Sequence, residues 1–393
     1  MSNKKTDAAK IQAIIELRES GLQWTEVAEE FNEKFNDTKS AEAVRLLYNR
    51  YADFYEVDDE KVRVKSLQTI KRTRDSSALN ARENRAILNV LNEQEDIVDQ
   101  IKTVVANLKD FKFKPQTPAK AKGGKTKMVM EAMISDTHYG LKTPTFNTQI
   151  ARQRMRKYAD VFISEYRRHL ANYDVIELVV LMNGDIIQSA TMHQDSAYAC
   201  DSTNPEQVAN AIESLFTDFL LPVAALGVKT RVIATPGNHD RFESSRITTN
   251  PGRAYLSHTI YRALQMLSQQ AGMKNVSWQI PQEAFAVYDV FGKWFLVEHG
   301  DLVKGATPAA LESQIARRSS QTDRNISGIR IGHFHQPTTI DLGRFVINGT
   351  LASDEHFAMG LGFKSITSQA INFYVETTRK TPYYYSFFAN LED

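Results

Sequence analysis

The stretch IRIGHFHQP (residues 329–337) begins like a buried strand and then places two histidines one residue apart. Because a strand alternates its faces, an extended chain would project His333 and His335 to the same side. Two imidazoles in one space are costly to bury without partners, and a metal ion is a common partner for imidazole nitrogens. The stretch therefore predicts a metal site at this strand end, for which other segments must supply further ligands.

Four more apolar strands are expected to end in polar turns, and a sixth strand is expected at RFVIN (344–348). MVMEAMIS runs into Asp136-Thr137-His138, VIELVVLM into Asn183-Gly184-Asp185, KTRVIAT into Pro236-Gly237-Asn238-His239-Asp240, and KWFLVE into His299-Gly300-Asp301. Strands that alternate with amphipathic helices predict an α/β sandwich. Ligands in open α/β sheets gather beyond the carboxyl ends of the strands. The strand ends therefore predict one shared site.

The side chains at these strand ends are typical metal ligands. The candidates are Asp136, His138, Asp185, Asn238, His299, His333 and His335. Carboxylate, imidazole and amide oxygen without thiolate suit manganese, iron, zinc or magnesium. The set is too large for one ion that keeps an open position, and it suits two ions about 3.5–4 Å apart that share a carboxylate. Five of the nine histidines occur in these motifs, which scattered histidines would not do.

The order of the motifs carries a resemblance to a known family. Asp-x-His, Gly-Asp, Gly-Asn-His-Asp, His-Gly and Gly-His-x-His resemble the calcineurin-like metallophosphoesterase superfamily over roughly residues 130–350. The resemblance implies a helix-flanked β-sandwich and two divalent ions, Mn²⁺ first and Fe, Zn or Mg as alternatives, with a hydroxide between them. The implied ligands are Asp136, His138 and His335 for one ion, Asn238, His299 and His333 for the other, and Asp185 as the bridge.

The resemblance also implies two catalytic residues that are not metal ligands. His239 is expected to face the scissile phosphate, where it stabilises charge or protonates the leaving oxygen. Asp240 is expected to orient His239, as the partner of a catalytic base does elsewhere.

The details of the motifs distinguish branches of the superfamily. Protein phosphatases continue the second motif as Asp-Arg-Gly and end the third in Glu, whereas this chain has GDIIQSA and Asp240. ISDTHYGL, PGNHD, VEHGD and GHFHQP are similar to the double-strand-break repair nucleases, although Gln188 stands where those enzymes usually have an acidic residue or histidine. The short segment after His335 argues against their capping domain and ATPase partner. We expect a compact DNA nuclease of repair or phage type; the alternative is a phosphodiesterase of small or cyclic nucleotides.

Three domains are expected along the chain, and residues 128–393 form the catalytic one. Residues 1–60 predict three helices in TDAAKIQAIIELRESG, WTEVAEEFNEKF and SAEAVRLLYNRYADF. This pattern resembles Myb-like helix-turn-helix modules, which implies a reading helix with Arg45, Asn49 and Arg50 on phosphates or bases. In the alternative hypothesis, this region serves assembly.

Residues 61–127 predict a basic and helical connector that ends in a linker. Residues 61–85 carry eight basic and two acidic side chains, and residues 109–127 carry seven and one. Lys71, Arg72 and Arg74 are candidate contacts to a phosphate backbone, although a solvated linker explains the charge equally well. Residues 86–108 have near-heptad apolar spacing, which fits either a coiled-coil homodimer or packing on the catalytic domain.

Composition excludes several protein classes. The formal net charge is +1, and Cys200 is the only cysteine, so neither an intrachain disulfide framework nor a zinc-thiolate site is expected. The N-terminus MSNKKTDAAK has no apolar core of a signal peptide, and no apolar run approaches membrane-spanning length. We therefore expect a cytoplasmic protein with no membrane partner.

Overall fold

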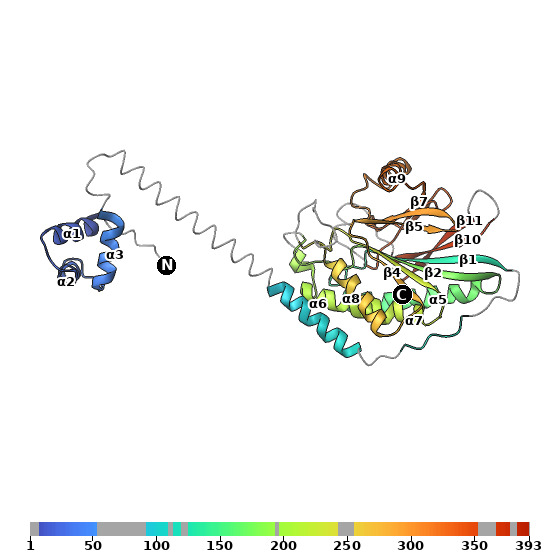
Figure 1. The fold of residues 1–393 in the computed structure, drawn as a ribbon, viewed down its shortest axis with the longest axis horizontal. Coiled ribbons are helices and arrows are strands. Elements are labelled where there is room, and N and C mark those ends of the chain that lie inside the picture. The colour runs from blue at the N-terminus through green and yellow to red at the C-terminus, as the bar shows by residue number, and fades with distance from the viewer. Residues whose placement is uncertain are drawn as a thin grey trace. The chain divides into compact units, whose positions relative to one another are not determined.

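The computed structural model describes residues 8–52, 92–108, 113–118, 125–192, 196–242, 255–352, 367–377 and 383–392. The chain divides into two compact units, residues 1–90 and 91–393 (Figure 1). The candidate nucleic-acid contacts Lys71, Arg72 and Arg74 lie outside the described residues.

Within its described residues, 8–52, the first unit has three helices, as the sequence predicts. They are α1 (Ala8–Glu19), α2 (Trp24–Phe35) and α3 (Ala41–Tyr51). Asn36, in the left-handed conformation with φ 46°, ends α2, and the Ser40 side chain caps α3 by accepting from the backbone of Ala43. Val27, Phe31 and their apolar neighbours meet in one small core. This unit thus folds by ordinary capping and amphipathic packing.

The second unit alternates strands and helices along the chain. Its strands are β1 (Thr126–Ile134), β2 (Tyr173–Asn183), β3 (Thr230–Thr235), β4 (Val276–Gln279), β5 (Phe285–Val290), β6 (Lys293–Glu298), β7 (Ile326–Ile331), β8 (Thr338–Ile340), β9 (Phe345–Ile347), β10 (Ser368–Val375) and β11 (Tyr383–Asn390). Its helices are residues 92–108, α5 (Thr148–His169), the short 3₁₀ helix η2 (Ser196–Ala199), α6 (Asn204–Ser214), the π-helical η3 (Leu215–Leu220), α7 (Leu221–Ala224), α8 (Leu256–Gln270) and α9 (Pro308–Thr322).

The strands form two sheets that pack face to face. One has the order β11-β10-β1-β2-β3-β4, with β1 to β4 parallel, and the other has the order β5-β6-β7-β9-β8, with β6, β7 and β9 parallel. Helices α5 to α8 lie along the outer side of the first sheet, and α9 lies outside the second (Figure 1). The expected α/β sandwich flanked by helices is confirmed.

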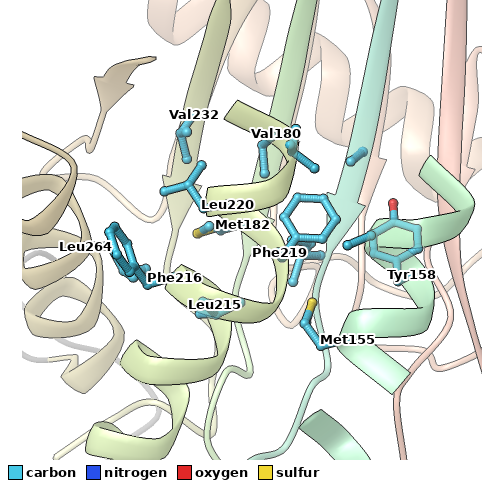
Figure 2. Packing of buried hydrophobic residues seen from close by; sticks show 14 of the residues in the cluster. Met155, Tyr158, Val180, Met182, Leu215, Phe216, Phe219, Leu220, Val232 and Leu264 are labelled. Carbon is cyan, nitrogen blue, oxygen red and sulfur yellow. The ribbon is translucent and has the colours of Figure 1, made fainter. Parts of the chain in front are cut away.

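The alternation of side chains along the central strands explains why helices cover one face of the first sheet and the second sheet covers the other face. On β2, Val180 and Met182 point to the helices, where they meet Phe216 and Phe219 (Figure 2), whereas Leu181 points to the other sheet. Burying an apolar side chain of this size stabilises the fold by about 1.5–3 kcal/mol. Both faces of the strand are therefore covered, and only its carboxyl end can present polar side chains to a ligand.

The helix at residues 92–108 belongs to the second unit. Ile97 and Val104 are buried in the same apolar cluster as α5 and α6, and Glu93 accepts a hydrogen bond from Asn204. Its apolar face, for which the sequence left dimerisation and intrachain packing open, packs on the catalytic unit. Among the described residues, no helix has the length and apolar character needed to cross a membrane.

Candidate metal centre

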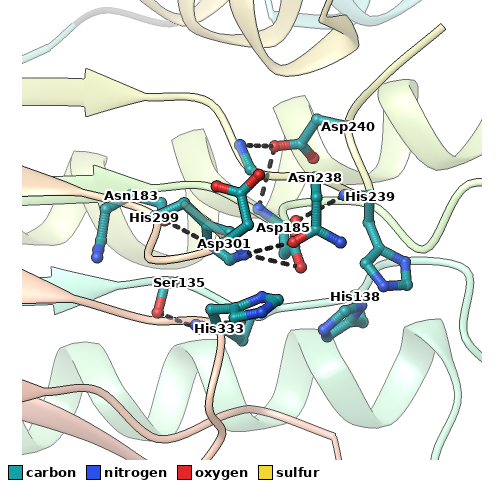
Figure 3. A network of polar contacts seen from close by, with 12 residues as sticks. Ser135, His138, Asn183, Asp185, Asn238, His239, Asp240, His299, Asp301 and His333 are labelled. Carbon is teal, nitrogen blue, oxygen red and sulfur yellow. Dashed lines mark hydrogen bonds and ion pairs between the residues drawn. The ribbon is translucent and has the colours of Figure 1, made fainter. Parts of the chain in front are cut away.

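The predicted ligands converge at the edge where the parallel strands of both sheets end. Asp136, His138 and His335 form one group and Asp185, His299 and His333 a second; within each group the potential ligand atoms lie within 4.8 Å of one another. Figure 3 shows the second group with Asn238, His239 and His138 beside it. The structure therefore brings together residues from β1, β2, β3, β6 and β7.

In the first group, three ligand atoms point to one position. The Nε2 atoms of His138 and His335 lie 3.2 Å apart, and Nε2 of His335 lies 3.1 Å from Oδ1 of Asp136. The Asp136 side chain is fully buried, whereas that of His335 is 15% exposed. An ion in this group would thus be reached from the side of His335.

In the second group, His299 is the central side chain. Its Nε2 lies 3.0 Å from Oδ2 of Asp185 and 3.1 Å from Oδ1 of Asn238, while its Nδ1 lies 2.9 Å from the Asn183 carbonyl. Because a carbonyl only accepts, Nδ1 carries the proton and Nε2 is the atom directed to the ligand position. The amide oxygen of Asn238, rather than its nitrogen, faces the same position.

The backbone of this edge is strained. Five predicted ligands adopt the left-handed conformation, namely Asp136 (φ 53°), His138 (φ 46°), Asp185 (φ 49°), His333 (φ 68°) and His335 (φ 54°). A left-handed residue other than glycine costs about 1–2 kcal/mol. Such strain persists only where the surrounding structure over-determines it, and it is typical of functional sites.

The left-handed backbone determines where the His333 and His335 side chains lie. Strand β7 ends at Ile331, so the two histidines do not continue an extended strand with alternating faces. They contribute to different ligand groups, His333 to that of Asp185 and His335 to that of Asp136. The expectation that an extended strand projects both side chains to the same face was wrong, because the backbone at His333 and His335 is left-handed and no longer extended.

Two glycines allow the close approach of the motifs. A Cβ on Gly237 would lie 2.3 Å from Oδ1 of Asp185, and a Cβ on Gly332 would lie 2.3 Å from Oδ2 of Asp136. Either contact is shorter than real Cβ atoms tolerate. Glycine is therefore required at both positions for the carboxylates to sit where they do.

The charges of the site favour ionised carboxylates. Burial raises the pKa of Asp136, but the imidazoles of His335 and His299 outweigh burial and hold it below its ordinary value. The pKa of Asp185 lies well below its ordinary value, because His299 and His239 outweigh burial. Burial and the charge of His299 lower the pKa of His333 to about 4, so this ligand is neutral at pH 7.

This donor set fits divalent metal ions. Two buried carboxylates surrounded by imidazoles would be costly to maintain without a cation. The nitrogen and oxygen donors suit Mn²⁺, Fe²⁺, Zn²⁺ or Mg²⁺, and the absence of thiolate argues against Cu⁺ and iron–sulfur clusters. The chain thus has two candidate metal-binding groups side by side.

His239 lies next to the first ligand group. The His239 and His138 rings meet edge to face with centroids 4.9 Å apart, and the His239 backbone N–H donates to Oδ1 of Asp185 at 2.8 Å. Nδ1 of His239 lies 2.9 Å from the carbonyl of Gln188 and must donate to it. Nε2 is therefore the ring nitrogen that can gain a proton.

Asp240 is placed differently from the expectation that it orients His239. Its two carboxylate oxygens accept four backbone N–H groups, those of Asp185, Ile186, Ile187 and Gly237. Burial and the Asp185 charge raise the pKa of Asp240 to about 6. Asp240 thus fixes the loop that carries Asp185, while the orienting partner described for His239 is the main-chain carbonyl of Gln188.

Sequence reasoning missed several residues of the site. Oδ2 of Asp301 accepts from Arg241 at 2.6 Å next to the second group (Figure 3). Beneath the first group, the Ser135 hydroxyl donates to Asp136, and Asn348 and Gln369 in turn contact Ser135. Asn348 is the polar residue that ends the stretch RFVIN, directly after β9, and this is a signal that could have been read. Gln369 lies within β10 and offers no such signal.

The described nucleic-acid candidates lie together on α3 in the first unit. Arg45, Asn49 and Arg50 are exposed, and Asn49 and Arg50 border a surface hollow of about 550 Å³ that also includes Lys39 and Leu46. Leu46 is 64% exposed. This helix thus presents cationic, amide and apolar groups on its solvent side.

Comparison with known proteins agrees with the motif order. A family model described as calcineurin-like phosphoesterase matches residues 132–347. A predicted phosphoesterase from Streptococcus pneumoniae is 10% identical, with a TM-score of 0.28, over 67% of this chain and 98% of its own. Vps29 from Entamoeba histolytica, solved with zinc, is 11% identical, with a TM-score of 0.28, over 66% of this chain and 98% of its own. Structural similarities with identities and TM-scores this low add nothing to the family match. A search of curated proteins found no significant match to the chain.

Proposed function

The chain belongs to the family of calcineurin-like phosphoesterases, and on this premise we propose that it is a two-metal phosphodiesterase that cleaves DNA. The observation that carries the proposal is the convergence of two ligand groups, with His239 beside them, at one sheet edge. A structural metal site needs a single closed group and no adjacent imidazole that can reach a substrate.

The ligand groups determine where the substrate would sit. Asp136, His138 and His335 would hold one ion; Asn238, His299 and His333 would hold the second; and Asp185 would contact both. When bound, the ions would activate water as a nucleophile and neutralise charge on the phosphoryl oxygens. The low pKa of Asp185 keeps this carboxylate charged, so that protons do not compete for it at neutral pH.

His239 is the residue that can move a proton to the leaving group. Because Nδ1 donates to the Gln188 carbonyl, a proton gained by the ring sits on Nε2. The same carbonyl stabilises the charged ring, and the hydrogen bond fixes the ring orientation. A phosphodiester with an alkoxide leaving group needs this proton, since alkoxides are poor leaving groups.

The first unit supports DNA as the substrate. Residues 8–38 carry seven acidic and three basic side chains, whereas residues 39–52 carry three basic and one acidic. By helix, α1 has two basic and two acidic side chains, α2 has four acidic and one basic, and α3 has two basic and one acidic. A basic helix with Arg45, Asn49 and Arg50 exposed fits a phosphate backbone better than it fits a small nucleotide.

The test uses end-labelled linear duplex, single-stranded and circular DNA with Mn²⁺. We expect wild-type protein, but not the His239→Ala variant, to cleave the DNA, and the product ladder will distinguish exonucleolytic from endonucleolytic action. Bis(p-nitrophenyl) phosphate is assayed in parallel. Hydrolysis of this small diester without DNA cleavage would retain the phosphodiesterase and refute the DNA assignment. Failure on both substrates would refute the proposed function.

A further inference from the structure

Three buried polar side chains form a connected group beneath Asp136. Ser135, Asn348 and Gln369 are each 0% exposed. Ser135 follows β1, Asn348 follows β9 in the other sheet, and Gln369 lies on β10. The group therefore links both sheets directly behind the first ligand group, and neither Asn348 nor Gln369 has a role in the reaction proposed above.

Backbone contacts fix the orientation of both amides. The Ala370 N–H donates to Oδ1 of Asn348 at 2.8 Å, so Nδ2 is the atom that faces Ser135 and Gln369. Oε1 of Gln369 accepts from the Ser135 N–H at 3.1 Å, and Nε2 donates to the Ser135 carbonyl at 3.1 Å. Because main-chain N–H groups only donate and carbonyls only accept, flipping either amide to swap its oxygen and nitrogen would lose hydrogen bonds.

The amides in turn fix the Ser135 hydroxyl. Asn348 donates to Oγ of Ser135 at 2.9 Å and to Oε1 of Gln369 at 2.8 Å. Since Oγ already accepts this hydrogen bond, its own proton is directed to the remaining neighbour, Oδ2 of Asp136. The group thus delivers one donor to one oxygen of the carboxylate.

The two oxygens of Asp136 consequently differ. Oδ2 accepts from the Ser135 hydroxyl, whereas Oδ1 lies 3.1 Å from Nε2 of His335, on the ligand side. The His333 N–H lies 3.0 Å from Oδ1 and 3.2 Å from Oδ2 and restrains the carboxylate from the second sheet. Rotation of the carboxylate would break the Ser135 contact.

We propose that Ser135, Asn348 and Gln369 are positioning residues that make Asp136 a ligand through Oδ1 alone and thereby set the affinity of the first metal position. The inference rests on the metal centre of the proposed function. Loss of a group that orients a metal ligand typically costs about 10- to 100-fold in metal affinity. The second position, with Asn238, His299 and His333, has no contact with the Ser135 hydroxyl among the described residues and keeps its affinity.

The experiment is a calorimetric Mn²⁺ titration of metal-free, full-length protein, with electron paramagnetic resonance to follow the two ions. Wild-type protein is expected to bind two ions. Ser135→Ala removes the hydroxyl that donates to Asp136. Asn348→Asp keeps the shape of the side chain but replaces the nitrogen that donates to Ser135 with an oxygen. We expect each variant to weaken one ion by roughly 10- to 100-fold and to leave the other unchanged.

Tyr158→Phe is the matched control. The fully buried Tyr158 hydroxyl donates to the Ala370 carbonyl at 2.7 Å, so the variant removes a buried hydrogen bond from the same strand without touching Asp136. It should lower the melting temperature and leave both affinities intact. Unchanged affinities in Ser135→Ala, or equal weakening of both ions in Ser135→Ala and Tyr158→Phe, would overturn the inference. A wild-type protein that binds no Mn²⁺ would instead overturn the metal centre itself.

Discussion

The three-helix unit and the metal centre are stabilised in opposite ways. In the helical unit, Val27 and Phe31 are buried in an apolar core, and among its described residues, 8–52, only Gly21 and Asn36, at helix ends, have positive φ. At the candidate metal centre, five predicted ligands have positive φ, and carboxylates such as Asp136 and Asp185 are buried. Local preferences suffice for the first region, whereas the second requires the whole sandwich to hold side chains and backbone that would not adopt this state alone.

This difference has a functional reason. A metal centre needs ligands aimed at one point before the ions arrive, and aiming them costs backbone strain and buried charge. A helical surface such as the one proposed here to contact DNA would need only exposed side chains on a regular scaffold. Single substitutions at the candidate metal centre should therefore lower activity by orders of magnitude, whereas single substitutions on the helices should change binding or stability by smaller amounts.

The largest effect is expected for Asp185→Asn. This change removes the carboxylate that would contact both ions. We therefore expect kcat/KM for bis(p-nitrophenyl) phosphate to fall about a thousandfold or more, which corresponds to a loss of several kcal/mol of transition-state stabilisation. Steady-state kinetics and Mn²⁺ titration measure it. An Asp185→Asn enzyme with near wild-type activity would contradict the two-metal arrangement.

His239→Ala should lower kcat by about 10²- to 10⁴-fold on DNA while both Mn²⁺ ions still bind. The loss should be smaller with bis(p-nitrophenyl) phosphate, because nitrophenolate leaves without a proton. Comparison of the two substrates isolates the proton-transfer role. Equal losses on both would show that His239 acts on the phosphoryl group instead.

Phe31→Ala tests the independence of the helical unit. Phe31 is fully buried in its small core, and truncation of such a side chain costs about 3–5 kcal/mol. Hydrogen exchange should become fast in α1 to α3 and stay slow in β1 to β3, with hydrolysis of the small diester retained. Simultaneous loss of protection in both units would show that they fold together.

Arg45→Ala with Arg50→Ala should weaken DNA binding and reduce the slope of log K against log salt by about 2, since each contact to phosphate contributes about one. Fluorescence anisotropy at several salt concentrations measures this. Lys34→Ala, on α2, removes a charge outside the proposed surface and serves as the control. An identical salt slope in the double variant would place DNA elsewhere.

The smallest effect is expected for Asp37→Asn. The hydrogen bond from Lys10, at 2.9 Å, lowers the pKa of Asp37 to about 2 from an ordinary 3.8. Because the folded pKa is depressed, the carboxylate contributes stability above pH 3.8 that is lost as pH falls toward 2. The melting temperature of α1 to α3, measured by NMR, should therefore be higher in wild type than in the variant at neutral pH, and the two values should converge near pH 2. A difference that persists at pH 2 would contradict the ion-pair origin.

The strand ends show how far sequence alone leads. Asp136, Asp185, Asn238, His299, His333 and His335 could be named because each belongs to a short motif next to an apolar run, and both features are local. The contacts of Asp240 could not be predicted, because its carboxylate oxygens accept from N–H groups of residues 185–187, which lie more than 50 positions away. Strand β10 was missed because buried Gln369 and Asn372 interrupt its apolar pattern.

The sequence by itself determined the fold class, the three N-terminal helices and which residues converge at the sheet edge, because these follow from periodicity and motif spacing. Only the tertiary structure decided that β10 pairs beside β1, that His333 and His335 serve different ligand groups, and that one oxygen of Asp136 faces the ligand position. The last depends on Gln369, 234 positions from Ser135. Hydrogen bonds across such separations are set by packing of the two sheets, and no local pattern encodes them.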